Sequence, residues 1–197
     1  MRIVVLVSGS GTNLQALIDA AAEERIPVEI AAVGSDVDGC GGLQRAERAG
    51  IPTFAVPLTR DDDRSTWNAG LKDQVRGFAP EMVVSSGFMR ILGAEFLDGV
   101  GVPIINTHPA LLPSFPGAHA VRDALAHGVK ITGCTVHQVD AGVDTGPIIA
   151  QEAVRIRQDD DQDSLHQRIK EHERLLLVQT LGRIAEGQVI LPAAQHS

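Results

Sequence analysis

Short runs of apolar and β-branched residues alternate along the chain with longer segments in which apolar residues recur every three or four positions. The runs with the length and composition of strands are Ile3–Val7, Val28–Val33, Thr53–Val56, Met82–Ser85, Pro103–Asn106, Thr132–Val139 and Ile148–Val154. Apolar strands that alternate with amphipathic helices are typical of a parallel sheet with helices on both faces. The pattern therefore predicts an α/β fold with an open, mostly parallel sheet.

The clearest helical periodicity lies in residues 63–79 and 163–186. Each segment follows a cluster of aspartates, whose carboxylates favour a helix N-terminus, and the segments stop at Pro80 and Gly187. The chain shows no internal repeat, low-complexity linker or break in composition, and its 197 residues suit one hydrophobic core. We therefore expect a single domain over residues 1–197.

Composition and charge narrow the classes of partner. The net charge is −8, only 3% of the residues are aromatic and Tyr is absent, which disfavours a nucleic-acid surface. An anionic ligand must therefore be held by local cations and backbone N–H groups. Cys40 and Cys134 lie far apart, as expected for reduced thiols in a cytosol. The first apolar run is too short to span a membrane, so we expect a cytoplasmic protein without a membrane partner.

A glycine turn follows the first strand, in the sequence SGSGTNLQ. Gly9 and Gly11 permit a tight turn, and Thr12 or Asn13 can cap the helix that follows. The backbone N–H groups of such a turn can bind phosphate, although a capped turn without a ligand is the alternative. Leu14 stands where a dinucleotide-binding motif has its third glycine.

Polar side chains also follow later strands. The loop SGFMRILG after the fourth strand carries one cation, Arg90, among apolar residues, which suits either the wall of a flat apolar ligand or a buried crossover. The fifth strand leads into Asn106 and His108, and the loop after the sixth contains Asp140 and Asp144. Because ligands of open α/β sheets bind outside the carboxyl ends of the strands, one cleft could gather these groups.

Several motifs, in order along nearly the whole chain, resemble the folate-dependent formyltransferase family, and within it the phosphoribosylglycinamide formyltransferases. They are Ser8-Gly9-x-Gly11-Thr12-Asn13-Leu14-Gln15, Gly87-Phe88-Met89-Arg90-Ile91-Leu92, Asn106-Thr107-His108-Pro109, Pro116-Gly117-x-His119, Gly133-x-Thr135-Val136-His137 and Asp144-x-Gly146-Pro147-Ile148-Ile149. Thr12, Thr107, Ala110 and Val121 depart from the family pattern of Ser, Ile, Ser and His. The resemblance implies a Rossmann-like formyltransferase fold.

The resemblance also implies a reaction. A formyl group passes from 10-formyltetrahydrofolate, a co-substrate, to the amine of 5-phosphoribosylglycinamide in de novo purine (IMP) biosynthesis, giving N-formylglycinamide ribonucleotide and tetrahydrofolate without a metal. The formyl oxygen becomes an oxyanion, and the leaving nitrogen gains a proton. Protonated His108 can serve both needs, Asn106 can donate to the same oxygen, and Asp144 favours the charged imidazole.

Further roles follow from the same resemblance. Phosphate binding falls to Gly11, Thr12 and Asn13, and folate binding to Arg64, Met89, Arg90, Ile91, Leu92, Asn106, Val139, Asp140 and Val143. The ribonucleotide is expected at Gly87, Pro109, Lys170 and Glu173, although a solvated helix face is the alternative for the last two. His119, Thr135 and His137 are expected to support the site by hydrogen bonds, whereas His166, His172 and His196 are interpreted as surface residues.

Other functions stay open at this point. A methionyl-tRNA formyltransferase is expected to add a C-terminal domain and a basic surface, and a formyltetrahydrofolate hydrolase an N-terminal regulatory domain; we expect none of these here.

Functions from other classes also stay open. A nicotinamide-binding protein could use the glycine turn, with Asp36 binding a ribose. A metal hydrolase could recruit His108, His119, His137 and Asp144, but close ligand spacing is missing. A non-catalytic folate or nucleotide sensor would not need the catalytic residues together. Either a monomer or a homodimer is compatible with the sequence.

Overall fold

The predicted strands all form and lie in one sheet. The computed structural model describes residues 1–191, and within them the strands are β1 (Arg2–Val7), β2 (Glu29–Ser35), β3 (Thr53–Ala55), β4 (Met82–Ser85), β5 (Ile104–His108), β6 (Ile131–Gln138) and β7 (Ile148–Arg155). Their order across the sheet is β3-β2-β1-β4-β5-β6-β7. The first strand therefore lies inside the sheet, between β2 and β4.

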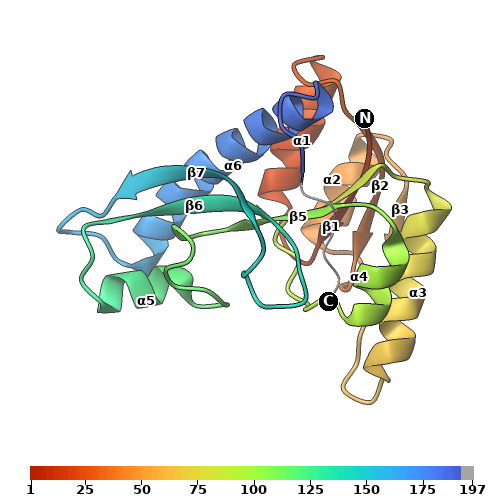
Figure 1. The fold of residues 1–197 in the computed structure, drawn as a ribbon, viewed down its shortest axis with the longest axis horizontal. Helices are drawn as coiled ribbons and strands as arrows, with labels where there is room; N and C mark the ends of the chain where they lie inside the picture. Colours follow the sequence, from red (N-terminus) through yellow and green to blue (C-terminus); the bar gives the residue numbers. More distant parts are fainter. Residues whose placement is uncertain (192–197) are drawn as a thin grey trace.

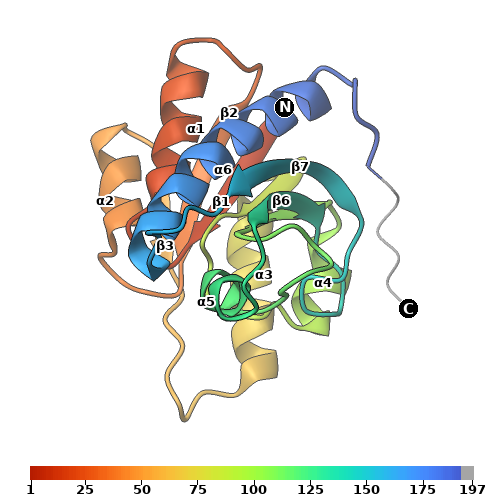
Figure 2. The ribbon, with the colours of Figure 1, turned by 90° about the vertical axis from the view of Figure 1, so that its left-hand side faces the viewer.

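Helices cover both faces of this sheet (Figures 1 and 2). They are α1 (Thr12–Ala22), α2 (Gly41–Arg48), α3 (Arg64–Gly77), α4 (Ala94–Val100), α5 (Ala120–Ala126) and α6 (Gln162–Ala185). Side chains of α1, α2, α5 and α6 pack with one face, and those of α3 and α4 with the other. The prediction of an open, mostly parallel sheet with helices on both faces is confirmed.

The central strand β1 explains why the first apolar run is continuous. Ile3, Val5 and Val7 belong to the hydrophobic core on one face, whereas Val4 and Leu6 belong to the core on the other. All five are at most 1% exposed. Because successive side chains of a strand point to opposite faces, a strand buried on both faces has no polar positions.

Strand direction changes at the end of the sheet. Strands β1 to β5 are parallel, but β6 pairs with β5 in the antiparallel sense and β7 pairs with β6 in the same way. The sequence did not predict this reversal, because β6 is buried along almost its full length and its apolar pattern resembles that of a parallel strand. The sequence had suggested that the loop after β6 leaves from the carboxyl edge of β5. Because β6 is antiparallel to β5, this loop leaves from the opposite edge.

The prediction that aspartates precede and stabilise the first turns of α3 and α6 is confirmed. Asp63 caps α3 by accepting from the Thr66 N–H at 2.7 Å. At α6, Asp161 accepts from the Ser164 N–H and the Ser164 hydroxyl accepts from the Asp161 N–H, which forms a capping box. The capping box fixes the start of α6, which carries the predicted site residues Lys170 and Glu173.

The predicted cap of α1 was wrong. The N-cap residue is Gly11, in a left-handed conformation with φ of 70°, and Thr12 and Asn13 already lie in the first helical turn. A Cβ atom on Gly11 would lie 2.6 Å from the Cα of Gly42, so the glycine turn packs closely against the start of α2. Only glycine combines this conformation with this approach.

Both cysteines are free thiols. Cys134 is fully buried in β6, and this burial, with the nearby carboxylates of Glu173 and Glu152, raises the pKa of its thiol to about 12. It therefore behaves as a small buried hydrophobe. Among residues 1–191, no helix has both the length and the apolar character required to cross a membrane.

We expect Asp161→Ala to lower the urea midpoint of unfolding by about 0.5 M, because the first turn of α6 loses its capping acceptor. Urea denaturation followed by circular dichroism measures the effect. Gln167→Ala, on the exposed side of the same helix, is the matched control and is expected to change stability by less than about 0.5 kcal/mol. Equal stability of the two variants would contradict a role for the cap.

Candidate active site

The turns after β1 and β4 meet where the sheet changes its winding direction. From β1 the chain proceeds to β2 on one side, whereas β4 and β5 lie on the other side. The Ser8 N–H donates to the Gly87 carbonyl at 3.1 Å, and the Ser86 N–H donates to the Leu6 carbonyl at 2.9 Å. In open α/β sheets this switch point is the usual place for a ligand.

A cavity of about 310 Å³ lies beside this point. Its walls include Gly87, Met89, Arg90, Ile91 and Leu92 from the loop after β4, and Asn106, His108 and Pro109 from β5 and its end. They also include His137 in β6 and Val139, Asp140, Val143 and Asp144 in the loop that follows. The structure thus brings the predicted catalytic residues together with most of the predicted folate residues.

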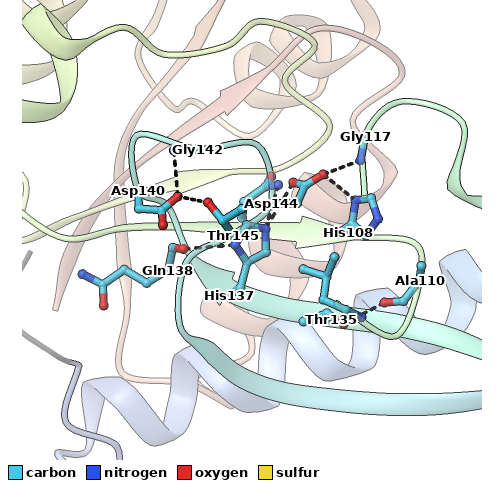
Figure 3. Close-up of polar contacts among 12 residues, drawn as sticks. His108, Ala110, Gly117, Thr135, His137, Gln138, Asp140, Gly142, Asp144 and Thr145 are labelled. Atoms are coloured by element: carbon cyan, nitrogen blue, oxygen red, sulfur yellow. Dashed lines mark hydrogen bonds and ion pairs between the residues drawn. The ribbon is translucent and has the colours of Figure 1, made fainter. Parts of the chain in front are cut away.

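His108 sits between two oxygen atoms. Its Nδ1 lies 3.3 Å from a carboxylate oxygen of Asp144, and its Nε2 lies 2.8 Å from the carbonyl oxygen of Phe115 (Figure 3 shows the pair with Asp144). Both partners can only accept hydrogen bonds when Asp144 is ionised, so an imidazolium with two N–H groups satisfies both. A neutral ring would direct a lone pair at one of the oxygens. Both ring nitrogens of His108 are thus placed to donate to protein oxygens.

Asp144 is held as a carboxylate by several donors. A hydrogen bond from His137, the Gly117 N–H and the charge on His108 lower its pKa from 3.8 to about 2, against the effect of burial. The Gly117 N–H donates at 2.8 Å, whereas His137 Nε2 is 3.5 Å from the other carboxylate oxygen. By distance, the contact with Gly117 is the stronger of the two.

His137 connects Asn106 with Asp144. Its Nδ1 donates to the Gln138 carbonyl at 3.0 Å, and its Nε2 lies 3.3 Å from the Asn106 side-chain nitrogen. A neutral His137 accepts at Nε2 from Asn106, and a protonated one donates from there to Asp144. Since Asn106 and His137 are directly paired across β5 and β6, their side chains lie on the same face of the sheet.

The loop between β6 and β7 folds back and places Asp144 next to His108. It starts beside β5, where the Val139 N–H donates to the Ile104 carbonyl at 2.8 Å. The Asp140 carboxylate accepts from the Thr145 hydroxyl at 2.7 Å and from the Gly142 N–H at 3.0 Å (Figure 3). Asp140 therefore shapes the loop in addition to lining the cavity.

The chain after β5 is anchored by Thr135. The Thr135 hydroxyl donates to the Ala110 carbonyl at 2.7 Å (Figure 3) and accepts from the Leu112 N–H at 3.1 Å. Farther along, Phe115 adopts a left-handed conformation with φ of 55° and presents its carbonyl to His108. This main-chain partner of His108 has no signature in the sequence.

The loop after β4 forms the expected apolar wall. Met89 and Ile91 are 76% and 62% exposed, whereas Phe88 and Leu92 are buried beneath them, so the alternative of a buried crossover does not hold. Arg64 supports the wall, because its Nη2 donates to the Ile91 carbonyl at 2.7 Å. The guanidinium of Arg64 also lies 5.2 Å from the centre of the Trp67 ring.

Helix α6 contributes a residue that the sequence interpretation missed. His166, interpreted as a surface residue, is half-buried and lines the cavity, and burial together with nearby Lys170 lowers its pKa. It precedes Lys170 by one helical turn, a spacing that could have identified it. Glu173, two turns from His166, is only 6% exposed, so a solvated helix face does not describe it.

The remaining predicted residues in the described part of the chain are not among those that line the cavity. Gly11, Thr12 and Asn13 form the start of α1, and His119 is the exposed N-cap residue of α5. His172 is half-buried, with Nδ1 3.9 Å from a carboxylate oxygen of Glu152, and His196 lies outside the described residues.

The structure gives less support to the alternatives of a nicotinamide ribose and a metal ion. The Asp36 oxygens are engaged by the Ser8 hydroxyl and Arg90 Nε, so Asp36 is not available to a ribose. In the part of the chain that the structure describes, no group of three or more His, Cys, Asp or Glu side chains is placed to hold a metal ion.

We expect Asp144→Asn to flatten the acid dependence of stability. Because its pKa is lowered to about 2 in the folded protein, Asp144 stabilises the fold above pH 4, and this contribution is lost as the pH falls towards 2. Urea denaturation at several pH values is expected to show a steeper loss for the wild type than for the variant. The exposed Asp38→Asn is expected to keep the wild-type slope, and parallel curves for all three proteins would contradict the prediction.

Known proteins that are similar to this chain support the interpretation of the site. A model of the formyl transferase family matches residues 1–181. A phosphoribosylglycinamide formyltransferase of Mycobacterium tuberculosis is 48% identical over 184 residues, covering 93% of this chain and 85% of that protein. The Escherichia coli protein of the same name is 37% identical over 189 residues, covering 96% of this chain and 89% of that protein.

Solved structures give the same result. The crystal structure of glycinamide ribonucleotide transformylase 1 from Symbiobacterium toebii superposes with a TM-score of 0.93 at 42% identity, covering 98% of this chain and 91% of that chain. The resemblance inferred from the sequence motifs is confirmed. The chain belongs to the formyl transferase family.

Proposed function

We propose that the protein transfers the formyl group of 10-formyltetrahydrofolate to the amine of 5-phosphoribosylglycinamide, in purine biosynthesis. The observation that carries the proposal is the position of His108, between the Asp144 carboxylate and a carbonyl oxygen, in the same cavity as Asn106. Relatives with 48% and 37% identity carry the name of this activity. The reaction needs a charged donor at the formyl oxygen and a proton for the leaving nitrogen.

In the proposed reaction, the neutral amine of the ribonucleotide attacks the formyl carbon. A new C–N bond forms and the formyl oxygen becomes an oxyanion, to which His108 and Asn106 donate hydrogen bonds. The bond from carbon to N10 of the folate then breaks. The amine nitrogen loses one proton and N10 gains one, so the proton count balances.

His108 must exchange one partner to bind the formyl oxygen. Both ring nitrogens face protein oxygens, and the carbonyl of Phe115 is neutral whereas Asp144 is ionised. A charged pair is the stronger interaction, so the carbonyl is the partner that a formyl oxygen replaces. Asp144 then keeps the imidazole charged and oriented, and His137 and Thr135 hold the neighbouring segments.

We assign different residues in and near the cavity to the two substrates. We assign the folate to the wall formed by Met89, Arg90, Ile91 and Leu92, supported by Arg64, to Asn106 in β5, and to Val139, Asp140 and Val143 in the loop after β6. We assign the ribonucleotide to Gly87 and Pro109, to Lys170 and Glu173 on α6, and its phosphate to Gly11, Thr12 and Asn13. The exposed apolar side chains of the wall and the N–H groups at the start of α1 support this division.

We also propose that residues 1–197 act as one domain in the cytoplasm, where thiols stay reduced. The two free cysteines fit such a compartment. Both a monomer and a homodimer are compatible with the proposed site, because the proposed catalytic residues Asn106, His108 and Asp144 come from one chain.

The proposed function is tested by mixing the purified protein with both substrates and following the release of tetrahydrofolate. We expect release only when the ribonucleotide is present. Equal release without the ribonucleotide would indicate that water accepts the formyl group, as in a hydrolase. No release in either mixture would contradict formyl transfer.

We expect Asp144→Asn to lower kcat by about 100-fold, because the neutral amide no longer favours charged His108. The KM for the ribonucleotide is expected to stay within about threefold, since Asp144 does not bind that substrate in the proposal. Steady-state kinetics over a range of pH measure both constants. The exposed Asp159→Asn is the control, and an unchanged kcat and pH profile in Asp144→Asn would remove Asp144 from the mechanism.

A further inference from the structure

A buried carboxylate lies between the glycine turn and the apolar wall. Asp36, just after β2, is 4% exposed. One of its oxygens accepts from the Ser8 hydroxyl at 2.5 Å, and the other accepts from Arg90 Nε at 2.6 Å. The Ser8 oxygen in turn accepts from the Met89 N–H at 2.8 Å. These bonds join the residues that follow β1, β2 and β4 into one network at the switch point of the sheet.

The network holds the main chain of the wall at a residue whose side chain lies outside the hydrophobic core. The Met89 side chain is 76% exposed, so fixing its main chain does not serve core packing. It fixes instead a segment whose side chains line the cavity. Arg90 is bound through Nε alone and is 37% exposed at its side chain, so the N–H groups at its outer nitrogens can serve a ligand.

We propose that Asp36 is a positioning residue for the folate side of the active site. Through Ser8 it fixes the main chain of the wall at Met89, and through Nε it orients the guanidinium of Arg90. A preorganised wall loses less conformational entropy when a flat ligand binds. The identity of that ligand rests on the proposed function, whereas the positioning itself can be tested on the free protein.

The first test is the kinetics of Asp36→Asn, which keeps the size of the side chain but removes the charge that holds Arg90. We expect the KM for 10-formyltetrahydrofolate to rise about tenfold. The kcat and the KM for the ribonucleotide are expected to stay within about twofold. Asp38→Asn, two residues away on the exposed turn, is the matched control and is expected to behave as the wild type.

A double-mutant cycle with Arg90→Gln shows whether Asp36 acts through Arg90. If it does, Asp36→Asn changes the folate KM less in the Arg90→Gln background than in the wild type. Additive effects in the cycle would overturn this part of the proposal. A general loss of kcat, or an equal rise in KM for both substrates, would show that Asp36 only maintains the fold and would overturn the proposal as a whole.

The second test needs no substrate. Trp67, the only tryptophan, stacks on Phe88 of the wall with ring centres 6.4 Å apart and planes 8° apart. We expect acrylamide to quench Trp67 fluorescence more strongly in Asp36→Asn than in the wild type or Asp38→Asn, because a loosened wall exposes the indole. Equal quenching in all three would overturn the positioning role. If the wild type transferred no formyl group, the proposed function would fail, and this measurement would still decide the role of Asp36.

Discussion

The contacts of the Asp144 carboxylate are the interaction on which the candidate active site depends. One carboxylate oxygen accepts from the Gly117 N–H and faces His108, and the other faces His137. These partners belong to β5, to β6 and to the chain between β5 and α5. A carboxylate removed from water needs such donors to stay ionised. The orientation of His108 thus depends on the correct placement of segments that are distant in the sequence.

Much of the fold could be predicted because burial determines the composition of the central strands. β1 and β4 are covered on both faces, so their sequences are continuous apolar runs whose limits are easy to find. The direction of β6 and β7 could not be predicted, since the side-chain pattern of a strand is the same in either direction. The start of α1 was misplaced because Gly11 caps through its backbone conformation and not through a side chain.

The sequence predicts the parts of the candidate site whose chemistry lies in the side chains of motifs. It does not predict the contacts that main-chain groups or distant residues make. Asn106, His108 and Asp144 could be named from their motifs, and the cavity contains all three. The Phe115 carbonyl that meets His108 could not, because any residue has a carbonyl. Asp36 was considered as a ribose ligand, but its partners Ser8 and Arg90 are 28 and 54 residues away, so only the fold shows that it is occupied.

Local charges explain how a chain with a net charge of −8 can accept anionic substrates. Arg45 of α2 donates to the Ser10 carbonyl at 2.8 Å and to the Gln15 side chain at 3.0 Å, and Arg64 donates to a carbonyl of the wall. These acceptors are neutral, so both guanidinium groups keep their full charge beside the glycine turn and the wall. Arg90 differs, because Asp36 offsets its charge and leaves it to act mainly by directed hydrogen bonds. These cations lie next to the glycine turn and the wall, whereas the sum over the surface determines solubility and long-range attraction.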